Sequence, residues 1–311
     1  MKRPPNSNPT NSCNFLSSDV IEASVPGSPL SVRIEYRLHD LTAPFFSTLK
    51  AVLNPRKTGN EKTKTSVSPS PEDDVLNLQP GEWVQVRSID EISITLDEAG
   101  KYKGLYFMPA MEKYCEKKFR VFKKAAIIKL EDTGEVRKLR SPSVFLEGVY
   151  CDGERHKGCD RACFHFWREA WLKKVPEPLQ QSVEETTNEK TIPAISPSPE
   201  NEGLNLQPGE WIQIKSVDEI GKTLDERRKY EGLYFMPEME KFCEKKFRVF
   251  KRAEIIKLES TGEVRKLKSP SIFLEGVYCD GEYHEGCDRA CYHFWREMWL
   301  KRIPEPLQQS V

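Results

Sequence analysis

The residues best suited to chemistry are cysteines and a histidine that follow one another closely, in two separate stretches. Thiolates and imidazoles are the ligands that Zn²⁺ prefers, normally in closed tetrahedral sets of four. Such a closed set would hold a small domain together by adding metal-binding energy to folding. The two stretches contain Cys151, His156, Cys159 and Cys163, and then Cys279, His284, Cys287 and Cys291.

Each stretch has a further thiol 36 residues upstream, Cys115 for the first and Cys243 for the second. Two ligand sets are therefore open in each stretch: four cysteines, or three cysteines with the histidine in place of the upstream thiol. Free buried thiols, disulfides and an iron–sulfur or redox role remain alternatives. We predict one structural zinc ion per stretch.

An internal repeat fixes the domain organisation. Residues 68–183 match residues 196–311 at a constant offset of 128, and the two copies differ at 25 of 116 positions. A period this long exceeds any solenoid unit, so each copy should be a domain with its own core. We call them the first module (68–183, core about 76–175) and the second module (204–311, with its repeat beginning at 196).

The flanking segments have a different composition. Residues 184–203 are polar and contain prolines, which predicts a linker. Residues 1–67 are predicted to be a largely disordered extension, within which the alternating pattern of Leu30–Leu38 is typical of a strand that docks on a partner.

Charge and hydropathy exclude several classes of protein. The chain carries 48 Lys and Arg against 48 Asp and Glu, and each module is nearly neutral by itself. This balance excludes a polybasic nucleic-acid binder, although not a local basic face. The sequence has no long apolar segment and no secretory h-region, so we expect a cytoplasmic protein that does not enter a membrane.

Within one module the pattern predicts a mainly β fold. Trp83 begins a strand after a Pro-Gly turn, a short helix follows at Ile89–Leu96, and two longer strands cover Phe119–Lys129 and Val136–Val149. A closing helix is predicted at Cys159–Lys174. The expected architecture is a tandem of small SH3-like, partly open barrels, each with a C-terminal helix and a Cys/His cluster.

Basic and aromatic residues alternate in Lys117–Lys124 and again in Lys245–Arg252. Strands of this kind can stack and neutralise single-stranded nucleic acid, although solvated lysines on an ordinary strand produce the same pattern. We favour the second interpretation because the modules are neutral.

The motifs together resemble a family of small uncharacterised bacterial proteins. The resemblance rests on Gly232–Met239, Cys243, Leu274–Gly276, Cys279–Gly281 and the run from His284 to Glu297. It covers nearly all of each module and implies no established activity. The family pattern has Glu after Met-Pro, which is Glu238 in the second module but Ala110 in the first, and Gly after the first Cys, where Glu116 and Glu244 stand here.

The sequence therefore predicts a non-enzymatic tandem binding or adaptor protein with a protein partner. No phosphate-binding glycine motif is present, and no third group is evident beside the Cys and His residues to orient a nucleophile. The alternatives are a nucleic-acid-binding tandem barrel and a cysteine- or metal-dependent accessory enzyme.

Overall fold

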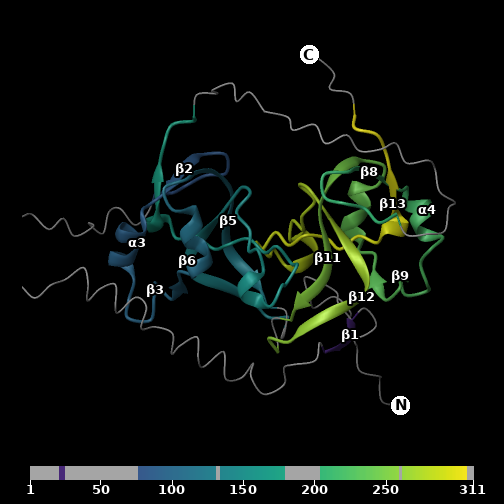
Figure 1. The fold of residues 1–311 in the computed structure, drawn as a ribbon, viewed down its shortest axis with the longest axis horizontal. Coiled ribbons are helices and arrows are strands. Elements are labelled where there is room, and N and C mark those ends of the chain that lie inside the picture. Colours follow the sequence, from purple (N-terminus) through teal and green to yellow (C-terminus); the bar gives the residue numbers. More distant parts are fainter. Residues whose placement is uncertain (1–20, 25–75, 131–133, 179–203, 259–260, 307–311) are drawn as a thin grey trace, which may run out of the picture.

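The computed structural model describes residues 21–24, 76–130, 134–178, 204–258 and 261–306. Over these ranges the chain is mainly β and forms two similar, partly open barrels that lie side by side (Figure 1). This confirms the predicted mainly β fold of tandem, partly open barrels. The predicted linker and the predicted strand at Leu30–Leu38 lie outside the described residues.

The first module has one sheet in the strand order β6-β5-β2-β7, with a small hairpin, β3-β4, beside it. Its elements, with η marking a 3-10 helix, are β2 (Trp83–Val86), α3 (Ile89–Thr95), β3 (Lys101–Tyr102), β4 (Leu105–Tyr106), η2 (Pro109–Tyr114), β5 (Lys118–Lys129), β6 (Val136–Leu146), η3 (Glu154–His156), η4 (Glu169–Trp171) and β7 (Leu172–Lys174).

The second module repeats this order, and strand β1 (Ile21–Ser24) joins the edge of its sheet by pairing antiparallel with β12. Its elements are β8 (Trp211–Ile214), α4 (Val217–Gly221), β9 (Lys229–Tyr230), β10 (Leu233–Tyr234), η5 (Pro237–Phe242), β11 (Lys246–Lys257), β12 (Val264–Leu274), η6 (Glu282–His284), η7 (Glu297–Trp299) and β13 (Leu300–Arg302).

Local chemistry explains the short helix α3. The Ser88 side chain accepts a hydrogen bond from the Glu91 backbone, and the Glu91 carboxylate accepts one from the Ser88 backbone. This capping box fixes the first turn and buries Ile92 in the core. The prediction of a helix at Ile89–Leu96 is confirmed to within one residue.

The core of each module is built around two tryptophans. Trp167 and Trp171 are fully buried, and Phe107 meets both rings edge-on at centroid distances of 6.2 and 5.2 Å. Arg168, between the tryptophans, donates to the carbonyl oxygens of Pro142 and Lys103 at 3.2 and 2.9 Å. The buried guanidinium therefore ties the turn in β6 to the β3-β4 hairpin.

The predicted helix at Cys159–Lys174 is wrong. Only η4 is helical within that range, and β7 follows it directly. The intervening backbone pairs with strands instead: Trp167 exchanges two hydrogen bonds with Val144, and Cys163 accepts one from the Cys151 backbone. Ala162 also adopts a positive φ of 49°, which no α-helix accommodates.

The two modules also contact each other, which the sequence pattern does not predict. The Tyr150 and Tyr278 hydroxyls are 2.7 Å apart, and Phe122 meets the Tyr278 ring at 5.2 Å. Ala290 of the second module belongs to a buried cluster with Phe145 of the first. The barrels therefore form one body rather than two separate units.

Two glycines in the first module give a sharp test of the loop that precedes Cys159. Gly153 has a φ of +80°, and a Cβ there would lie 2.0 Å from the carbonyl oxygen of Cys159. We expect Gly153→Ala to lower the free energy of unfolding by several kcal/mol, because backbone rather than a flexible side chain occupies the space. Chemical denaturation would measure the loss.

Gly158→Ala is the matched control. Gly158 has a similar φ of +77°, but, its chain neighbours apart, nothing lies within 4 Å of the position that a Cβ would take. That variant should cost only the left-handed backbone strain, about 1–2 kcal/mol. Equal losses in the two variants would contradict the close backbone approach.

Candidate metal centre

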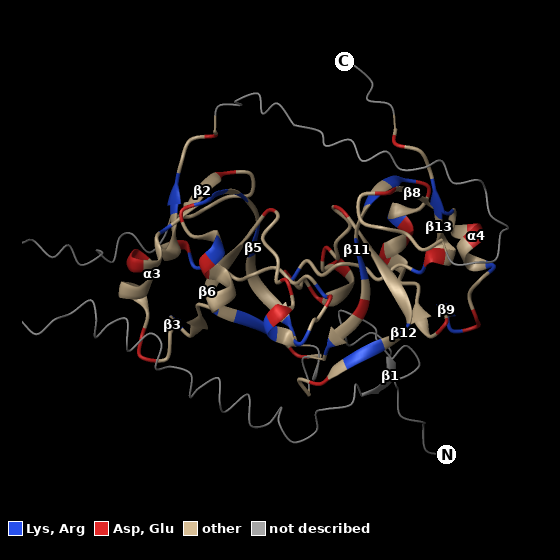
Figure 2. Cartoon of the chain, in the orientation of Figure 1, with Lys and Arg blue, Asp and Glu red and all other residues tan. Residues whose placement is uncertain are grey.

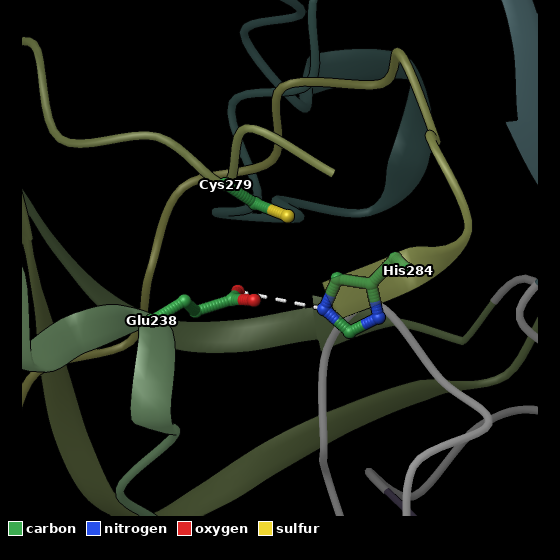
Figure 3. A group of neighbouring side chains, drawn as sticks. All are labelled: Glu238, Cys279 and His284. Atoms are coloured by element: carbon green, nitrogen blue, oxygen red, sulfur yellow. Dashed lines mark ion pairs between the residues drawn. The ribbon is translucent and has the colours of Figure 1, made fainter. Parts of the chain in front are cut away.

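Three side chains of the second module converge from separate segments. Glu238 lies at the start of η5, Cys279 directly follows the bridge between Tyr278 and Tyr292, and His284 is the last residue of η6. Figure 3 shows the carboxylate, the thiol and the imidazole directed toward one another.

Backbone hydrogen bonds shape the loop that carries two of these residues. The Cys279 N–H donates to the carbonyl of Cys291 at 2.8 Å, and the His284 N–H donates to the carbonyl of Gly281 at 2.9 Å. Gly281 has a φ of +84° and approaches the backbone of Cys287. The loop is thus folded back by its own backbone, with Cys279 and His284 on the side that faces Glu238.

The three groups are buried and poorly satisfied. Their ligand atoms all lie within 4.8 Å of one another, and the exposed fractions of Glu238, Cys279 and His284 are 3, 5 and 4%. Glu238 Oε1 is 3.4 Å from His284 Nε2, but neither carboxylate oxygen and neither ring nitrogen has a well-formed hydrogen bond. A buried charge without partners costs several kcal/mol, so the arrangement points to a missing ligand.

The electrostatics of the site keep the acid charged and the thiol protonated. Burial acts to raise the pKa of Glu238, but His284 and the neighbouring His293 outweigh it and hold the pKa below its ordinary value. Burial raises the pKa of the Cys279 thiol strongly, and the Glu238 carboxylate adds to this effect. A cation placed between the three groups would reverse the second shift by stabilising the thiolate.

The structure brings together some of the predicted ligands and not others. Cys279 and His284 are in this group, with Glu238 as a third member that the ligand prediction did not include. In the part of the chain that the structure describes, the remaining predicted ligands are in no such group: Cys115, Cys151, His156, Cys159, Cys163, Cys243, Cys287 and Cys291.

The cysteines outside the group have other surroundings. Cys159 and Cys287 are buried at the contact between modules, where each sulfur accepts a backbone hydrogen bond from the other module. Cys163 and Cys291 line a pocket at the same junction, together with Arg161, Phe164, Phe166, Arg289, Tyr292 and Phe294.

The first module repeats the loop but not the acid. Ala110 stands where the second module has Glu238, and Cys151 and His156 are only half-buried. His156 Nδ1 lies 3.4 Å from the Lys257 ammonium of the other module. The one sequence signal for the acidic ligand was therefore the Ala110/Glu238 difference between copies.

The basic strands predicted as an alternative binding face are β5 and β11. Their aromatic rings are stacked inside the chain, Phe122 on Phe164 and Phe250 on Tyr292, each at 4.9 Å. Figure 2 shows basic and acidic residues interspersed over both modules.

Comparison with known proteins finds no matching family model and no matching curated protein. Among the described residues, no helix is long and apolar enough to cross a membrane.

His165 predicts a pH dependence of stability. Burial lowers the pKa of its imidazole from the ordinary value of 6.5 to about 4. The unfolded chain therefore binds a proton more strongly than the folded chain. Stability is full above pH 6.5 and falls as the pH drops toward 4, by up to about 3 kcal/mol. We expect His165→Gln to remove this component, measured by denaturation across that range; parallel curves for the variant and wild type would contradict it.

Proposed function

We propose that this chain is a non-enzymatic binding protein whose second module is held in shape by one zinc ion. The observation that carries the proposal is the buried trio of Glu238, Cys279 and His284, in which the carboxylate oxygens and both ring nitrogens lack well-formed hydrogen bonds. A single bound cation would satisfy all three groups at once.

The geometry fits zinc. Zn–N and Zn–O bonds of about 2.0–2.2 Å and Zn–S bonds of about 2.3 Å place tetrahedral ligand atoms roughly 3.3–3.8 Å apart. The separation of 3.4 Å between Glu238 Oε1 and His284 Nε2 falls within that range. A thiolate with an imidazole and a carboxylate is a mixed set that suits this borderline-soft ion better than Mg²⁺ or Ca²⁺.

The surroundings support a structural rather than a catalytic ion. A catalytic zinc keeps a position open to water and substrate, whereas all three residues here are at least 95% buried. A cysteine-based enzyme is also disfavoured. Burial raises the pKa of both Cys115 and Cys243 to about 11, so these thiols are protonated and weakly nucleophilic at neutral pH.

A protein partner is favoured over nucleic acid because groups that nucleic acid would require are already engaged. Lys123 pairs with Asp288 at 3.1 Å and Lys251 with Asp160 at 2.9 Å, both across the contact between modules. Phe122 and Phe250 are stacked internally, so these rings of β5 and β11 are not available to stack on bases. Because the two modules contact each other, a partner in the cytoplasm would bind them as one body rather than as two separately tethered modules.

Metal content tests the proposal. We expect protein purified without added metal to contain one zinc per chain by elemental analysis. Cys279→Ser or Glu238→Gln should reduce this to well below one, because each removes a ligand. Chelation should lower the melting temperature of the wild type and have little effect on either variant, since a ligand that binds only the folded state stabilises it.

Cys151→Ser and His156→Gln are the matched controls in the first module, and both should retain one zinc per chain. A wild type without metal, or one whose zinc survives loss of Cys279 but not of Cys151, would contradict the proposal. Cobalt substitution gives a second readout, because a bound thiolate produces a charge-transfer absorption that Cys279→Ser must abolish.

The difference between the copies gives a gain-of-function test. Ala110→Glu places a carboxylate at the position equivalent to Glu238, beside Cys151 and His156. We expect the zinc content to rise from one to two per chain, measured on folded monomer. Ala110→Gln is the control, since an amide of the same size is a poor zinc ligand and should leave the content at one.

A further inference from the structure

We propose that each module carries a self-complementary docking surface whose occupant is a second copy of the module, so that the two halves of the chain bind each other without the connecting segment. The inference is independent of the zinc proposal and rests on the contacts between the modules.

The surface on the first module lies along β5, at a point where its ladder with β6 is irregular. The register between β5 and β6 shifts between Ala125 and Ile127, with the extra residues in β6. The backbone N–H groups of Ala126 and Ile127 both donate to one carboxylate oxygen of Asp288, each at 2.9 Å. The aspartate of the other module thus supplies the hydrogen-bond partner of two consecutive backbone groups of β5.

Further contacts extend this docking in both directions along β5. The Asp288 N–H donates to the Ile127 carbonyl at 2.8 Å, and the other Asp288 oxygen pairs with Lys123 at 3.1 Å. One step away, the Lys129 N–H donates to the sulfur of Cys287 at 3.3 Å. The first module thus binds Cys287 and Asp288 through both backbone and side-chain groups, as it would bind a short strand.

The same contacts occur with the roles of the modules exchanged. The register between β11 and β12 shifts between Ala253 and Ile255, and Asp160 accepts from the Glu254 and Ile255 N–H groups at 2.9 and 2.8 Å. The other contacts are repeated as well. The Asp160 N–H donates to the Ile255 carbonyl at 2.7 Å, Lys251 pairs with Asp160 at 2.9 Å, and the Lys257 N–H donates to the Cys159 sulfur at 3.2 Å.

The centre of the contact follows the same symmetry. Tyr150 and Tyr278, equivalent residues, join their hydroxyls at 2.7 Å, and each ring meets a phenylalanine of the opposite strand at 5.2 Å. When residue i meets residue j and j meets i throughout, the interface is isologous, as in a two-fold dimer. Such a surface fits any second copy of the module, whether or not a chain connects the two.

The segment that connects the two modules then determines which copy each module binds. The 25 residues between the described ranges of the modules raise the effective concentration of the attached partner to about millimolar. The full chain is therefore expected to pair its own halves and to remain monomeric at micromolar concentration.

The test uses the full, folded chain with a protease site inserted within 184–203. After cleavage, the wild-type halves should still elute together at the size of the intact protein. Asp160→Asn combined with Asp288→Asn should weaken their association by at least about a hundredfold, because each charged hydrogen-bonding acceptor is worth about 1.5–3 kcal/mol. Sedimentation velocity over a dilution series measures the change.

Asp152→Asn is the matched control, paired with the single Asp160→Asn variant. Asp152 lies in the same loop, but it contacts Lys113 and the Glu154 backbone within its own module. It should leave the nicked halves together. Lys123→Ala with Lys251→Ala, at half-buried side chains, weakens the interface without altering the loops and guards against misfolding of the aspartate variants.

Separation of the wild-type halves as folded units at micromolar concentration would overturn the proposal. So would an Asp160→Asn, Asp288→Asn double variant whose halves associate as tightly as those of the Asp152→Asn control.

Discussion

The arrangement of this protein depends on a carboxylate from each module that completes the backbone hydrogen bonding of the other. Asp160 and Asp288 each accept two consecutive backbone N–H groups from a long strand of the other module, where the register of that strand with its neighbour shifts. For Asp288, burial acts to raise the pKa of the carboxyl group. These hydrogen bonds and Lys123 outweigh that effect and hold the pKa below its ordinary value, so the carboxylate stays charged. Each sheet is thus completed by the other module.

The loop that contains Asp288 also carries Cys279 and His284, two of the three proposed metal ligands. Cys279 and His284 lie on the side facing Glu238, while Cys287 and Asp288, at its end, contact β5 of the first module. Its path is set by a left-handed glycine at Gly281, which leaves no room for a side chain. Order in this one loop therefore serves both the buried site and the contact between modules, and a bound ion would stiffen both together.

The sequence predicted those strands and helices whose positions depend on the local pattern of apolar residues. The spacing of apolar residues located β5, β6 and α3 closely. The spacing of Phe164, Trp167 and Trp171 imitated a helix face, but Phe164 and Trp167 are buried in an extended segment whose backbone pairs with strands, and Trp171 lies in the short η4. Contacts between residues far apart in sequence could not be predicted: each aspartate and the backbone N–H groups that donate to it are more than 90 residues apart. Glu238 escaped the ligand prediction because it lies 41 residues before Cys279.

The differences between the copies follow from these two kinds of site. A self-complementary surface meets its own equivalent, so Asp160 and Asp288 remain the same residue in both modules. The buried group of Glu238, Cys279 and His284 belongs to one module alone and can differ without disturbing that symmetry, as Ala110 and Glu238 do. At the rim, where the two meet, the exchange of Lys157 for Glu285 has a local effect. Glu285 pairs with Lys129 of the first module at 3.0 Å, whereas Lys257, the second-module equivalent of Lys129, approaches His156 of the first module. The bonds from the aspartates to the backbone are thus the same in both directions, while this contact at the rim differs between them.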